Sequence, residues 1–201
     1  YTDSLGIAWT PDAMLWPDMD RWSARANITP PAGDTSAMYQ TLPFFPPAAT
    51  STSTSSAFMK QTKFCYMLPS IGDAVYYLVR ASFWYGTAPN TTLYETRTPG
   101  FIGFRMVVDT SLGAHINITL PQSSPYIEEM YLWSQGTGTP VPVCFSSASD
   151  DSDSPFVSSL EMRPLPKTMS SVAIMTNTYF ALRTIQRVDL GASPDIPSVI
   201  R

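Results

Sequence analysis

The chain has 201 residues, of which 44% are hydrophobic and 14% are charged, and its net charge is −4. This acidic balance argues against nucleic acid as a partner, because phosphate binding needs clustered lysine and arginine. No apolar run approaches the roughly 20 residues of a membrane-spanning helix. The length fits one large β domain or two small ones. Low charge together with 19 prolines favours short strands, many turns and an extracellular setting.

The first quarter of the chain shows no sustained hydrophobic period. Residues 1–28 contain Trp9, Trp16 and Trp22, and aromatic residues without a period predict irregular chain packed over the ends of a sheet. Residues 29–57 combine repeated prolines with a tract of serine and threonine, which predicts a surface loop. A linker between two domains is the alternative, but the residues before it hold too few strands to form a domain.

The central strand is predicted over residues 75–85, the longest segment in which side chains alternate in character. Side chains of a strand point to opposite faces in turn, and one face here is wholly apolar. That face is expected in the core and consists of Val75, Tyr77, Val79, Ala81, Phe83 and Tyr85. The opposite face, which includes Arg80 and Ser82, suits a half-covered surface.

The remaining strands follow at intervals of about ten residues, with turn signals between them. They are predicted over residues 64–68, 101–109, 115–120, 126–133, 141–145 and 156–163. In the third of these, Asn117 is expected to point outward. Residues 179–187 fit either a short helix or a last strand, since periodicity does not decide between them. This spacing predicts an all-β domain, either a β-sandwich or a jelly roll.

Motifs for catalysis, metal binding or cofactor binding are not apparent. The single histidine, His115, is expected on an exposed strand face without the converging partners that a catalytic or metal role needs. Glu128 and Glu129 are neighbours on a strand and therefore face opposite ways, so they cannot share a substrate. The acidic residues at 150–153 offer oxygen ligands for calcium, but their spacing lacks the pattern of a calcium loop and favours a solvated hairpin tip. We therefore expect no enzyme, no metal and no cofactor.

Five residues carry information about location. Asn27, Asn90 and Asn117 each begin an N-glycosylation triplet, and the last two are the better candidates because one lies in a turn and the other on an outward face. Cys65 and Cys144 lie in separate predicted strands. In a secreted chain an even number of cysteines favours a disulfide, and a buried pair of free thiols is the alternative.

Several blocks of the sequence resemble the signature segments of plant malectin-like domains, which occur outside the membrane in receptor-like kinases, often of the leucine-rich-repeat type. The strongest are FCYML at 64–68, YLVRASFWYG at 77–86 and PFVSSLEMRPL at 155–165. Residues 1–9 resemble the opening segment of the family, and Val143-Cys144-Phe145 resembles the block before the last signature. The blocks occur in the family's order across nearly the whole chain.

The resemblance implies a jelly-roll β-sandwich with short helical or irregular segments, on the extracellular side of the plasma membrane. It implies a malectin-like domain over residues 1–188 and a junction over 189–201 that leads to a second lobe. The first residues do not have the pattern of a signal peptide. We therefore expect a mature fragment of a receptor, whose transmembrane segment is not part of this sequence. The sequence departs from the family pattern after Gly86 and at Arg105.

The resemblance leaves two main functional classes open. The first is recognition of carbohydrate, such as a cell-wall polysaccharide, through aromatic rings and a few polar groups. The second is recognition of an extracellular protein or signalling peptide, and a third role is that of a spacer for another lobe. Contacts are expected from loops at strand ends and not from the apolar inner face. The aromatic candidates are Trp84, Tyr85, Tyr94 and Trp133.

Overall fold

A computed structural model provides the structure of the chain. It describes residues 2, 8–12, 24–33, 37–44, 63–74, 76–86, 100–109, 112–133, 138–147, 154–165 and 182–183. Among the described residues, no helix is both long enough and apolar enough to cross a membrane.

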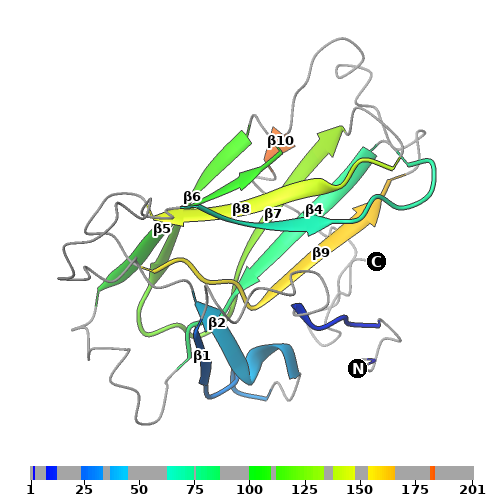
Figure 1. Ribbon diagram of the computed structural model, residues 1–201. Coiled ribbons are helices and arrows are strands. Elements are labelled where there is room, and N and C mark those ends of the chain that lie inside the picture. Colours follow the sequence, from blue (N-terminus) through cyan, green and yellow to red (C-terminus); the bar gives the residue numbers. More distant parts are fainter. Residues whose placement is uncertain are drawn as a thin grey trace, which may run out of the picture.

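Two four-stranded antiparallel sheets form the body of the domain (Figure 1). Sheet I has the order β10-β7-β4-β9, with the bounds Leu182–Arg183, Tyr126–Trp133, Tyr76–Phe83 and Ser159–Pro164. Sheet II has the order β3-β8-β5-β6, with the bounds Lys63–Leu68, Val141–Ser147, Phe101–Val108 and Leu112–Thr119. The alternation of apolar and polar residues sets both registers, because a slip by one residue would turn each core side chain to solvent.

The core lies between the two sheets and is centred on Phe83 of β4. Its ring lies 5.5 Å from the ring of Phe104 on β5 and 6.1 Å from that of Phe145 on β8, measured between centroids. These contacts join sheet I to sheet II and place their inner faces against each other, as in a β-sandwich. The inner face predicted for the central strand is confirmed for Tyr77, Val79, Ala81 and Phe83, which are fully buried. Tyr85 lies beyond the end of β4 and is half-buried, and Val75 lies outside the described residues.

A smaller layer formed by the N-terminal part of the chain lies beside this sandwich. It contains β1 (Ala24–Asn27), the 3-10 helix η1 (Ala37–Tyr39) and β2 (Thr41–Phe44), and β1 pairs with β2. Figure 1 shows β1 and β2 next to the end of β4 and the start of β9. The prediction of a surface loop over residues 29–57 is wrong for this part, because Leu42 is fully buried and Tyr39 is 8% exposed. Pro43 lies within β2, and this is compatible with a short two-stranded sheet because the backbone nitrogen of proline has no hydrogen to donate to a neighbouring strand.

The predicted all-β sandwich is confirmed. Each strand predicted between residues 64 and 163 is present with small shifts at its ends, and the segment at 179–187 contains the short strand β10. The Cys65–Cys144 disulfide is also confirmed, and it joins directly paired residues of β3 and β8. The proposed junction at 189–201 lies outside the described residues.

Candidate functional site

A pocket of about 290 Å³ lies between the N-terminal layer and one side of the sandwich. On this side β9 is the last strand of sheet I and β3 is the last strand of sheet II. The N-terminal layer therefore covers the place where the two sheets would otherwise open to solvent. The pocket is lined by Trp9, Thr10, Pro11, Asp12, Ala37, Met38, Thr41, Pro43, Tyr66, Val157, Ser158, Ser159 and Leu160.

Ser158 holds the floor of the pocket in place. Its backbone N–H donates to the carbonyl oxygen of Ser82 at 2.9 Å. Its hydroxyl accepts from the backbone N–H of Trp84 at 2.9 Å and donates to the Trp84 carbonyl oxygen at 3.3 Å. These three bonds attach the residue that precedes β9 to the end of β4. They also satisfy backbone donors and acceptors at the point where the regular hydrogen bonds between the two strands end. The neighbouring floor residues Tyr66 and Val157 are each 3% exposed.

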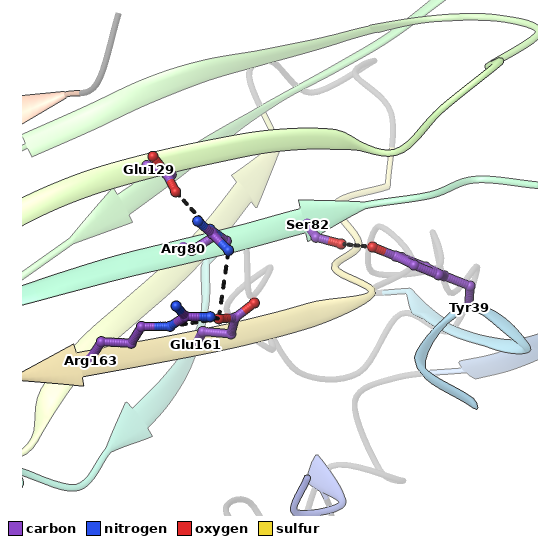
Figure 2. Close-up of polar contacts among 6 residues, drawn as sticks. All are labelled: Tyr39, Arg80, Ser82, Glu129, Glu161 and Arg163. Atoms are coloured by element: carbon purple, nitrogen blue, oxygen red, sulfur yellow. Dashed lines mark hydrogen bonds and ion pairs between the residues drawn. The ribbon is translucent and has the colours of Figure 1, made fainter. Parts of the chain in front are cut away.

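Two side chains anchor the N-terminal layer that forms the pocket wall. The Tyr39 hydroxyl lies 2.9 Å from the Ser82 hydroxyl, a contact that Figure 2 shows between η1 and β4. The indole N–H of Trp84 donates to the Thr29 carbonyl oxygen at 2.7 Å. Gly86 permits this approach, because it has a φ of 60° and a Cβ there would lie 2.8 Å from the same oxygen.

The lining suits a small, largely uncharged polar ligand. Trp9 supplies aromatic surface, and Thr10, Thr41 and Ser159 supply hydroxyl groups, whereas Tyr66 is almost wholly buried in the floor. Asp12 is the one carboxylate among the described residues of the lining. Apolar walls with a few placed polar groups are typical of small-molecule sites, and the volume is near the lower limit of such sites.

A second polar feature crosses the outer face of sheet I. Arg80 of β4 is paired directly with Glu129 of β7 and Glu161 of β9. Its Nε donates to Glu129 Oε1 at 2.6 Å, and its Nη1 lies 3.9 Å from Glu161 Oε2. Arg163 also donates to Glu161, so four alternating charges form a ladder across three strands (Figure 2). We call these four residues the charge ladder.

The charge ladder is partly shielded from water. The exposed fractions of its side chains are 21% for Arg80, 8% for Glu129, 17% for Glu161 and 35% for Arg163. Half-buried charges are tolerated when each has an opposite partner. The two positive and two negative charges of the charge ladder therefore balance one another across the three strands.

The aromatic residues that the sequence suggested do not converge on one site. Trp84 is 7% exposed and packs in the core, which leaves little of its ring for stacking on a ligand. Tyr85 is half-buried and its ring packs on Phe156 at 5.6 Å. Trp133 pairs with Tyr76 at the opposite end of β4, roughly 25 Å from Trp84 at the rise of a strand. Tyr94 lies outside the described residues.

The acidic, histidine and asparagine candidates that the structure describes lie on the strand faces that the alternation of side chains predicts. Glu128 and Glu129 face opposite sides of β7: Glu128 accepts from the Tyr126 hydroxyl at 3.1 Å, whereas Glu129 joins the charge ladder. His115 and Asn117 are exposed on β6, and Asn27 is exposed at the end of β1. Asn90 and the acidic residues at 150–153 are not among the described residues. Within the described part of the chain, no three histidine, cysteine or acidic residues are grouped to hold a metal ion.

None of the described residues that line the pocket is among the aromatic candidates that the sequence suggests. Trp9 was visible as an aromatic residue in an irregular segment, and Ser158 and Ser159 lie inside a block that carries the family resemblance. No local pattern places Trp9 in one pocket with residues of β9, because this depends on how the chain before β1 folds back.

A β-sandwich with an aromatic and hydroxyl-lined pocket at its side is typical of a recognition module, in which the sheets provide the frame and the connecting segments provide the contacts. Comparison with known proteins identifies the family. The sequence model of the malectin-like domain family matches residues 1–201, and the chain belongs to this family.

The relatives are plant receptor-like kinases. A probable leucine-rich-repeat receptor-like serine/threonine-protein kinase of Arabidopsis thaliana is 32% identical over 130 residues, which cover 65% of this chain and 12% of the kinase. The crystal structures of the ANX1 and ANX2 ectodomains of Arabidopsis thaliana match with TM-scores of 0.50 and 0.52 and identities of 19% and 17%. Each match covers 83% of this chain and 39% of the ectodomain. These structural matches agree with the sandwich fold.

Proposed function

We propose that the chain is an extracellular, non-catalytic recognition domain of a plant receptor-like kinase, and that the side pocket binds an uncharged carbohydrate of the cell wall. Family membership and the kinase relative support the receptor context. The confirmed disulfide fits an oxidising compartment. In the full receptor, a second malectin-like lobe and a membrane anchor would follow this domain.

The observation that carries the carbohydrate proposal is the composition of the pocket lining. A sugar ring has an apolar face that stacks on an aromatic side chain and hydroxyl groups that exchange hydrogen bonds with polar ones. Trp9 is half-buried at the pocket and is suited to stacking, while Thr10, Thr41 and Ser159 offer hydroxyl partners. The Asp12 side chain would accept hydrogen bonds from sugar hydroxyls.

The test is calorimetric titration of the secreted chain with a panel of neutral cell-wall oligosaccharides. We expect Trp9→Ala to weaken binding by at least tenfold, which corresponds to about 1.4 kcal/mol. Trp133→Ala is the matched control, because Trp133 is also a half-buried tryptophan but lies at the far end of sheet I. Equal loss in both variants, or no binding to any member of the panel, would argue against the side pocket as a carbohydrate site.

Recognition of a protein or peptide is the second candidate, and the outer face of sheet I favours it. The charge ladder lies there with Tyr131 and Trp133, which are half-buried on the same face of β7. Aromatic residues and arginine are enriched at the centres of protein interfaces. For a partner protein we therefore expect Trp133→Ala to weaken binding and Trp9→Ala to leave it unchanged, the reverse of the carbohydrate result.

A further inference from the structure

Phe101 is the most exposed large hydrophobic residue among those described. It lies at the start of β5 on the outer face of sheet II, and 68% of its surface is exposed. Exposing a whole phenylalanine ring to water is unfavourable by about 25 cal/mol for each Å² of apolar surface. The position of the ring therefore suggests that another group covers it.

A glycosylation triplet lies directly across from this ring. Phe101 is paired with Thr119, and Gly103 is paired with Asn117, so the triplet from Asn117 to Thr119 runs beside the start of β5. Asn117 and Thr119 are both exposed, on the same outer face as Phe101. Among the described strands, β6 lies at the edge of sheet II, where the triplet is accessible to a modifying enzyme.

Gly103 lies between these two side chains and has no side chain of its own. A Cβ built on Gly103 would lie 3.3 Å from Asn117 Oδ1 and 3.6 Å from Phe101 Cε2. The asparagine amide and the edge of the phenylalanine ring therefore border the same position above the sheet. Any side chain at 103 would occupy this position, whereas glycine leaves it free.

We propose that Asn117 carries an N-linked glycan, and that its first N-acetylglucosamine packs on the ring of Phe101. The sugar is attached to the Asn117 amide nitrogen and extends over the diagonal cross-strand neighbour, a distance that side chains on paired strands commonly bridge. Its apolar face covers ring surface that is otherwise in water. This inference rests on the extracellular location in the proposed function and assigns a specific structural role to Phe101.

The glycan also protects the edge of the sheet. An unpaired edge strand is a template for pairing with another chain, and bulky polar groups at the edge prevent this. Because β6 and β3 are the two ends of sheet II, the glycan at Asn117 lies on the opposite side from the pocket. Its loss is therefore expected to leave oligosaccharide binding unchanged.

The experiment uses the chain secreted by a cell line that makes only high-mannose glycans, with site occupancy measured by peptide mass spectrometry and Tm by calorimetry. Asn117→Gln and Thr119→Ala both remove the triplet, the second while keeping the asparagine. We expect each to lower Tm by roughly 2–4 °C, the effect of losing one modest contact in a chain of this length. Phe101→Ala should cause a similar loss in glycosylated protein, and the double variant with Asn117→Gln should lose no more. Trimming to the first sugar with endoglycosidase H should leave Tm unchanged.

Three outcomes would overturn the inference. One is a secreted chain with no glycan at Asn117, even when Asn27 or Asn90 is occupied, a result that leaves the extracellular location standing. Another is a Tm loss for Asn117→Gln that is equally large in the Phe101→Ala background. The third is a Tm loss on trimming to the first sugar. Failure of carbohydrate binding at the side pocket is a separate result and affects none of these.

Discussion

Phe83→Ala is the sharpest test of the sandwich core. Phe83 is fully buried, and its ring contacts those of Phe104, Tyr126, Phe145 and Phe156 at centroid distances of 5.5 to 6.1 Å. Replacing a buried phenylalanine by alanine removes transfer free energy and leaves a cavity, which costs about 3–5 kcal/mol. Contacts to rings from both sheets place this site toward the upper end of that range.

The expected loss is a large part of the total stability, because domains unfold with a free energy of about 5–15 kcal/mol. With a urea dependence of about 2 kcal/mol per M, a loss of about 4 kcal/mol lowers the urea midpoint by about 2 M. Intrinsic fluorescence follows the transition, and an unchanged slope shows that the variant alters stability and not the unfolded state.

Phe101→Ala is the matched control, since it removes the same side chain from the exposed outer face of sheet II. In protein that lacks the glycan at Asn117, we expect its free energy of unfolding to change by less than about 0.5 kcal/mol. A midpoint for Phe83→Ala no lower than that for Phe101→Ala would refute the assignment of Phe83 to the centre of the core.

Two further predictions concern the covalent and polar links. Replacing both Cys65 and Cys144 by serine should lower the free energy of unfolding by about 4 kcal/mol, because the disulfide closes a loop with a sequence separation of 79. In the unaltered chain, the intact mass under non-reducing conditions should show no free thiol. Tyr39→Phe should cost about 1–2 kcal/mol, because it removes a hydrogen-bond partner from Ser82, which is 4% exposed. Tyr76→Phe is the control, because Tyr76 lies on the same face of β4 as Ser82, and it should lower the free energy of unfolding by less. Both values are measured by urea titration, and equal losses would count against a role for the Tyr39 contact.

The sandwich could be predicted from the sequence because most of its strands have side chains that alternate between a buried and an exposed face. In β6 the apolar side chains alternate with glycine or polar residues, and in β5 buried residues alternate with exposed or half-buried ones, so the core determines which residues face inward. The central strand β4 was harder to interpret, since Leu78 and Ser82 on its outer face are also buried. The N-terminal layer covers Ser82 through Tyr39, and this cover comes from a segment 43 residues away in sequence.

The N-terminal layer and the pocket could not be predicted for a related reason. The composition of residues 29–57 is that of a loop, and the burial of Leu42 arises from long-range packing that no local period reports. The sequence predicts Trp84 as a ligand contact because this residue lies near the end of the central strand. Its burial depends on the Thr29 carbonyl oxygen, which accepts from the indole nitrogen. A large aromatic side chain with one polar atom serves equally well as an anchor or as a contact, and only the position of its partner distinguishes the two.

The same anchors connect the architecture of the domain to its proposed function. The pocket has one wall from the N-terminal layer and one from the sandwich, so it exists only while these two parts stay attached. Tyr39 and Trp84 make that attachment at the end of β4, and Ser158 ties the pocket floor to the same strand end. A ligand that contacts both walls therefore binds only the attached state, and by linkage its binding stabilises that state against local opening. Changes at these anchors should consequently weaken binding even though none of them lies on the aromatic surface that a sugar would contact.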